Sequence, residues 1–175
     1  VQCGMGRAGK LFAYELADVT PDIMGLAKGI GGGFPVGAVL ATEKAASGMV
    51  PGTHGSTYGG NPLAMAAANA VLDVMLEKDF LASVLKKGTK LKNDLVSLVE
   101  KHSTVLESVR GVGLMLGIKS VGPNLELMAV FRENKLLTVV AGENVVRVLP
   151  PLNVSEEEIS EAVQKIDQTC SQVSS

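Results

Sequence analysis

The stretch DIMGLAKGIGGGFP, residues 22–35, decides the fold of this 175-residue chain. Its apolar run, Ile23 to Ala27, predicts a buried strand that ends at a single lysine, Lys28. Four glycines follow at positions 29, 31, 32 and 33, and they let backbone or a ligand approach closely. Because open α/β sheets bind ligands at strand ends, we expect the Lys28 amine to lie in a crevice there.

A lysine in such a place has a definite chemistry. Burial disfavours the charged ammonium, so it would lower the pKa of Lys28 from the usual value of about 10.4. A neutral amine can then attack a carbonyl carbon and form a Schiff base. A short motif also fits an ordinary solvated loop lysine, so the rest of the chain has to decide between the two.

Composition excludes several classes of function. A hydrophobic content of 46% allows a sizeable core, and a net charge of -2 gives no basic surface for nucleic acid. No apolar run has the length of a membrane span, so we expect no membrane partner. His54 and His102 are too few and too far apart to predict a metal site. Cys3 and Cys170 lie at opposite ends, which favours thiols in a reducing cytoplasm.

The first part of the chain alternates short strands and helices. Asn61 and Pro62 predict a helix start, and the small residues that follow predict a helix buried on all sides. A long amphipathic helix comes next, with Gly88 as its weak point and the domain boundary inside it. The other predicted elements are a short helix over 11–16, a strand over 36–42 and a helical turn over 43–49.

The last part reads as a small α+β unit. Val112, Leu114, Leu116 and Ile118 alternate, which predicts one half-buried strand, and His102 before them is expected in solvent. Ser155 and Glu158 form a capping box that starts the last helix. Between them we expect a helix over 124–134, strands over 136–140 and 145–149, and a turn over 141–144.

Two further places could bind an anion. The loop over 52–61 offers the hydroxyls of Ser56 and Thr57 next to a helix N-terminus, which suits a phosphate, although a capped turn with ordinary polar residues fits equally. Arg147 lies within an apolar strand, so its guanidinium must be paired, exposed on the other face, or kept for a ligand. A planar guanidinium suits a carboxylate ligand well.

Taken together, these motifs resemble the class III, pyridoxal-phosphate-dependent aminotransferases of fold type I. The resemblance rests on residues 1–9, on residues 21–35, on residues 54–63 and on residues 145–151, in the order of the family. It implies an α/β fold in which residues 1–95 are the end of the large cofactor domain with its connecting helix. Residues 96–175 would then form the small C-terminal α+β domain.

The resemblance also implies a role for each candidate residue. Lys28 would hold pyridoxal 5'-phosphate and then move the proton between substrate and cofactor. Thr57 would bind the cofactor phosphate across a dimer interface, with Ser56 near the substrate, and Val1 and Gln2 would approach the cofactor ring. Arg147 would take the carboxylate of the substrate. The implied partners are a small amino donor, 2-oxoglutarate and a second copy of the chain in a homodimer with shared active sites.

Several parts of the family pattern are absent from the 175 residues, among them the aspartate that pairs with the pyridine nitrogen. We therefore expect the isolated chain to be an inactive C-terminal portion of a longer enzyme. Two other readings stay open. One is a non-catalytic phosphate-binding or interaction module, and the other is a truncated product that pairs with a separate N-terminal piece.

Overall fold

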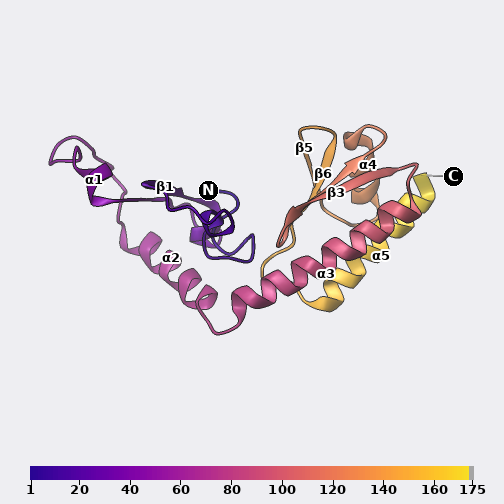
Figure 1. The fold of residues 1–175 in the computed structure, drawn as a ribbon, viewed down its shortest axis with the longest axis horizontal. Coiled ribbons are helices and arrows are strands. Elements are labelled where there is room, and N and C mark those ends of the chain that lie inside the picture. The colour runs from indigo at the N-terminus through magenta and orange to yellow at the C-terminus, as the bar shows by residue number, and fades with distance from the viewer. Residues whose placement is uncertain (174–175) are drawn as a thin grey trace. The chain divides into compact units, whose positions relative to one another are not determined.

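The computed structural model describes residues 1–173 and divides them into two compact units (Figure 1). The first unit is Val1–Leu81 and the second begins at Ala82. The boundary between the two units falls inside helix α3, Phe80–Lys101. The sequence also predicts a domain boundary within this helix. Among residues 1–173, no helix has both the length and the apolar character that crossing a bilayer requires.

The first unit is built on a small antiparallel sheet. Both strands are predicted by their apolar runs, and strand β1, Ile23–Leu26, pairs with β2, Ala38–Ala41. The burial prediction for β1 is wrong, because Ile23 is 63% exposed and only Leu26 is buried. One face of the two strands packs on the apolar cluster through Met24, Leu26 and Ala38, and the other strand residues are exposed. The remaining elements of this unit are η1 (Ala13–Leu16), η2 (Lys28–Gly31), α1 (Glu43–Ala46) and α2 (Pro62–Met75).

Helix α2 starts where the sequence predicts. The Asn61 side chain accepts a hydrogen bond from the Ala64 N–H at 2.9 Å, and proline occupies the first helical position. The helix is not buried on all sides, since Leu63 is 66% exposed. One side packs on the unit's apolar cluster, whose buried members are Met5, Leu26, Ile30, Ala68 and Met75.

The second unit contains a four-stranded antiparallel sheet with the order β3-β4-β6-β5. The alternating residues do not form the one strand that they predict, because Gly113, at φ 57°, turns the chain between β3 and β4. Val112 ends β3, Leu114 lies in the turn, and Leu116 and Ile118 belong to β4. The pairs Leu116–Val148 and Ile118–Val146 stand opposite each other on one buried face. The strands are β3 (Leu106–Val112), β4 (Met115–Ser120), β5 (Val139–Ala141) and β6 (Val145–Val148).

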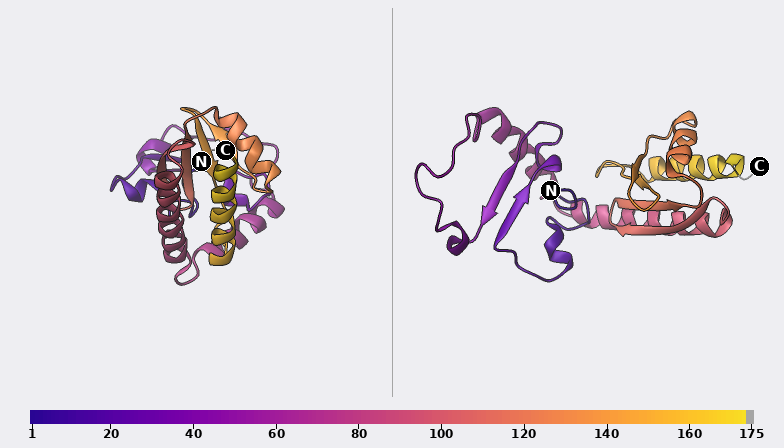
Figure 2. Two further views of the ribbon diagram at one scale, coloured as in Figure 1. Left: turned by 90° about the vertical axis from the view of Figure 1, so that its right-hand side faces the viewer. Right: turned by 90° about the horizontal axis from the view of Figure 1, so that it is seen from above.

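Three helices complete this unit: α3, α4 (Asn124–Glu133) and α5 (Glu156–Val173). Figure 2 shows α3 and α5 side by side, and ion pairs Lys86–Glu156 and Lys101–Asp167 join them near both ends. Their fully buried side chains include Val84, Leu91, Leu95, Ile159 and Ile166, which fill the core with the inner face of the sheet. The predicted capping box at the start of α5 is present in both directions.

Gly88 is a contact point rather than a weak point of α3. A Cβ built on Gly88 would lie 2.4 Å from the carbonyl carbon and oxygen of Gly113. The helix therefore approaches the β3–β4 turn so closely that only glycine fits. The lower helix propensity of glycine is offset here by packing between backbones.

His102 is buried rather than solvated, with 7% of its surface exposed. Its Nε2 lies 2.5 Å from Oδ1 of Asp167, and the other carboxylate oxygen accepts from Lys101 Nζ at 2.8 Å. The hydrogen bonds from His102 and then from Lys101 lower the pKa of Asp167 below its ordinary value. This cluster connects the end of α3 to α5.

The close approach at Gly88 makes its replacement costly. In an exposed helix Gly→Ala stabilises by about 1 kcal/mol, but here Gly88→Ala should lower the free energy of unfolding by about 2 kcal/mol. Chemical denaturation measures the change. Thr89→Ala, at the exposed neighbouring position, serves as the control and should leave stability almost unchanged. A higher denaturation midpoint for Gly88→Ala would show that the two backbones are not in contact.

The lowered pKa of Asp167 predicts a pH-dependent loss of stability in acid. A depressed carboxyl pKa stabilises the fold above the unfolded-state pKa of about 4 and stops doing so as pH falls through the folded-state value. Asp167→Asn should therefore cost about 1 kcal/mol at about pH 6, and the gap from wild type should shrink at about pH 3. Denaturation midpoints at both pH values test this. An equal gap at both would rule the pair out as the source.

Candidate active site

Lys28 lies directly after β1, at the first position of the 3-10 turn η2. Its backbone has φ 53°, in the left-handed region that lysine rarely adopts. Such strain, of the order of 1–3 kcal/mol, concentrates at functional positions. The expected burial of the amine is wrong for the described residues, since Lys28 is exposed and η2 buries Ile30 and Gly31 instead. The sequence gives no sign of the strained backbone, because no local pattern requires it of a lysine.

The opening residues of the chain lie beside Lys28. A Cβ built on Gly25 would be 3.9 Å from Cγ1 of Val1, and one built on Gly29 would be 3.3 Å from Cβ of Met5. Residues 1–5 therefore run alongside residues 25–29 in the same direction. Val1 thus lies beside Gly25 of β1, and Met5 lies beside Gly29, the residue that follows Lys28.

The glycine turn after Lys28 is held by tight packing. A Cβ on Gly31 would lie 2.7 Å from Val36, and one on Gly32 would lie 2.7 Å from Val71 of α2. Gly32 also has φ 57°, which glycine adopts without strain. The glycine turn is thus packed closely against α2, and this packing fixes the backbone that follows Lys28.

Ser56 and Thr57 are fully available to a ligand. They lie in the exposed loop before α2, and Gly59 packs so closely on Ser56 that a Cβ there would be 2.9 Å away. The Asn61 side chain donates to the Tyr58 carbonyl at 2.9 Å, which closes the loop onto the start of α2. Two hydroxyls next to a helix N-terminus suit a phosphate. Within residues 1–173, no hydrogen bond links this loop to Lys28.

Arg147 belongs to the second unit and is half-buried in β6. Its neighbours across the sheet are Gly117 and Val139, and its Nη2 donates a long hydrogen bond of 3.4 Å to the carbonyl of Val140. Its Nε is buried and has no hydrogen-bond partner among the described residues. A buried donor without a partner is costly, so this guanidinium is suited to an anion that would complete its bonding.

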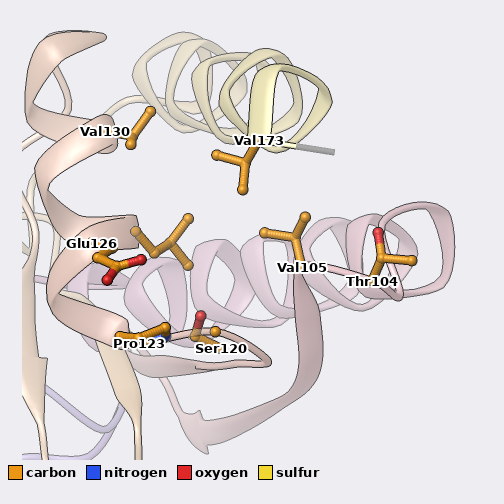
Figure 3. Close-up of a pocket in the computed structure, with 9 residues that line it drawn as sticks. Thr104, Val105, Ser120, Pro123, Glu126, Val130 and Val173 are labelled. Atoms are coloured by element: carbon orange, nitrogen blue, oxygen red, sulfur yellow. The ribbon is translucent and has the colours of Figure 1, made fainter. Parts of the chain in front are cut away.

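The second unit also contains a cavity of about 400 Å³ that includes none of the predicted site residues. Figure 3 shows Thr104, Ser120 and Glu126 around it, with Val173 of α5 at one side. Its lining is mainly apolar. The candidate catalytic groups therefore lie elsewhere, on strand ends and loops.

Comparison with known proteins identifies the family. The profile of the class-III aminotransferases matches residues 1–170. Acetylornithine aminotransferase 1 of Bradyrhizobium diazoefficiens is 57% identical over 175 residues, which are 100% of this chain and 43% of that protein. The chain thus spans less than half the length of the curated relatives it matches.

Solved structures of aminotransferases are similar to this chain in both sequence and fold. Acetylornithine aminotransferase from Elizabethkingia anophelis is 38% identical, with a TM-score of 0.91 over 98% of this chain and 44% of that one. Ornithine aminotransferase from Toxoplasma gondii, described with partial occupancy of PLP at its active site, is 29% identical, with a TM-score of 0.92 over 99% of this chain and 42% of that one. The expected fold of the aminotransferases is confirmed. This chain belongs to the class-III aminotransferases, a family of pyridoxal-phosphate-dependent enzymes.

Proposed function

We propose that the whole protein transfers the amino group of N2-acetylornithine to 2-oxoglutarate, a step in arginine biosynthesis, with pyridoxal 5'-phosphate as its cofactor. The proposal rests on the observation that Lys28 is an exposed lysine with a strained backbone conformation at a strand end. The names of the relatives supply the substrate, since curated proteins at 47–57% identity are acetylornithine aminotransferases. In the isolated chain we expect no activity.

Lys28 has the main catalytic role in this proposal. The bound cofactor supplies an electron sink that stabilises negative charge on the substrate carbon. The exposed Lys28 amine is open to a covalent link with the cofactor aldehyde, so the site fits the group. With the cofactor bound by the substrate, Nζ of Lys28 would take the proton from the substrate carbon and would deliver it to the cofactor. The strained backbone keeps the amine at the strand end for both tasks.

The remaining site residues bind and orient. Thr57 and the N-terminus of α2 would hold the cofactor phosphate, with Ser56 next to the substrate. Val1 and Gln2 would lie along the cofactor ring, which is supported by the place of Val1 beside Gly25 of β1. Arg147 would bind the substrate carboxylate through the donors that the fold leaves open.

Ornithine is a second candidate for the amino donor. Two ornithine aminotransferase structures match with TM-scores of 0.91 and 0.92, although their identity of 34% and 29% is below that of the acetylornithine relatives. Succinyldiaminopimelate is a third donor of the same class. Steady-state kinetics of the whole protein with each amine, at equal 2-oxoglutarate, separates the three by kcat/KM.

We also propose a cytoplasmic homodimer with shared active sites. The loop over residues 51–60 is exposed throughout, and Tyr58 within it is 81% exposed, as expected of a surface that a second chain covers.

Loss of the Lys28 amine should abolish transamination. In the whole protein, Lys28→Ala should lower kcat by more than about 1,000-fold, because both covalent binding and proton transfer depend on it. The control is Lys44→Ala, an exposed lysine of the same unit, which should keep nearly full activity. Retained turnover in Lys28→Ala would show that another group performs these steps, and a wild-type whole protein without turnover would favour the phosphate-binding module.

Shared sites predict that two inactive variants restore activity when mixed. Lys28→Ala removes the amine, and Thr57→Asp places a negative charge against the phosphate. In a mixed dimer one site carries both defects and the other none, so random exchange of equal amounts should recover about a quarter of wild-type activity.

Thr53→Asp makes the same change in the same loop, where the Thr53 hydroxyl donates to the Val50 carbonyl at 2.7 Å. It should stay active alone. No recovery on mixing, with dimers shown to exchange, would place the whole site within one chain.

A further inference from the structure

The β5–β6 turn is fixed by an asparagine that no site assignment uses. Glu143 and Asn144 have φ 58° and 59°, in the left-handed region that asparagine tolerates. The Asn144 side-chain amide donates to the carbonyl of Ser120 at 2.7 Å and to that of Gly122 at 2.8 Å. The turn is therefore bonded to the end of β4, some twenty residues earlier in the chain.

A second asparagine holds the two strands of the same hairpin. Nδ2 of Asn124, at the start of α4, donates to the carbonyls of Ala141 and Val145, both at 3.0 Å. Its backbone N–H donates to Oδ1 of Asn144 at 2.9 Å. The side chains of Asn124 and Asn144 together take part in five hydrogen bonds. These bonds connect the β5–β6 hairpin to the start of α4 and to the end of β4.

The backbone carbonyls to which Asn124 donates belong to residues close to Arg147 and to its hydrogen-bond partner. Val145 precedes Arg147 by two positions on β6, and Ala141 follows Val140, whose carbonyl accepts from the Arg147 guanidinium. That hydrogen bond is 3.4 Å long, so it is too weak to orient the group by itself. The relative position of β5 and β6 then decides where the guanidinium points, and the hydrogen bonds from the two asparagines reinforce the backbone pairing that sets it.

We propose that Asn124 and Asn144 are positioning residues that orient Arg147 for the carboxylate of the amino acceptor. The inference rests on the proposed function, in which Arg147 binds that carboxylate. A purely structural turn would behave differently. Its loss would lower stability and kcat without changing carboxylate affinity in particular, whereas a positioning role predicts a selective rise in KM for the acceptor.

The test uses two variants of the whole protein that remove the side-chain bonds in different ways. Asn144→Gly keeps a residue that adopts positive φ and deletes only the amide. Asn124→Ala deletes the two bonds to the strand carbonyls. Asn134→Ala is the matched control, since Nδ2 of Asn134 also donates twice, to Val130 and Gln172, at the other end of α4.

Each positioning variant should raise the KM for 2-oxoglutarate about tenfold, which corresponds to about 1.4 kcal/mol, with kcat within about twofold of wild type. The inhibition constant of glutarate, which carries carboxylates but no keto group, should rise by a similar factor. Asn134→Ala should change neither. Unchanged KM and unchanged glutarate inhibition in both positioning variants would overturn the proposal.

Arg147→Gln, measured alongside, separates this inference from the function on which it rests. If Arg147→Gln raises both constants and the asparagine variants do not, the positioning role is wrong and the function stands. If Arg147→Gln changes neither constant, Arg147 does not bind the carboxylate and the positioning role falls with it. Wild-type protein without turnover would contradict the proposed function, and direct titration with glutarate would still decide the role of the asparagines.

Discussion

The backbone of Lys28 is the constraint on which the rest of the site depends. A lysine at φ 53° is held there only if both neighbours are fixed. On one side β1 pairs with β2, and on the other Gly31 and Gly32 press against Val36 and Val71. Because a Cβ on either glycine would come within 2.7 Å of a valine, the turn has little freedom to relax. The glycines thus act by permitting contact, and flexibility is not their role.

The second unit applies a similar principle with polar groups. Arg147 is an arginine in an apolar strand, and its Nε is buried without a partner in the described residues. Such a group is stable in place only when its surroundings hold it and an anion completes its bonding. Asparagine side chains suit this role, because one NH2 group can donate to two backbone carbonyls while the amide oxygen accepts from a backbone N–H.

Much of this could be predicted from the sequence, since it depends on local pattern. The strand before Lys28, the Asn61 cap and the capping box at Ser155 follow from neighbouring residues, and the identity of the family follows from four short motifs in order. Long-range contacts could not. Gly88 suggests a weak helix until Gly113, twenty-five positions later, is seen against it.

The exposure of Lys28 and the burial of His102 were mispredicted for the same reason. Burial depends on what packs against a residue, and that is not encoded in its neighbours along the chain. The side-chain contacts of Asn124 and Asn144 also escape sequence reading, because their amides donate to backbone carbonyls, which every residue has. The proposal is that Lys28, Ser56, Thr57 and Arg147 serve one active site.

The most direct test of the account is to find which side chain carries the cofactor. Whole protein incubated with pyridoxal 5'-phosphate and reduced with borohydride would be digested, and its peptides analysed by mass spectrometry. The account predicts one modified residue, Lys28. Modification at another lysine, or none with cofactor bound, would contradict it.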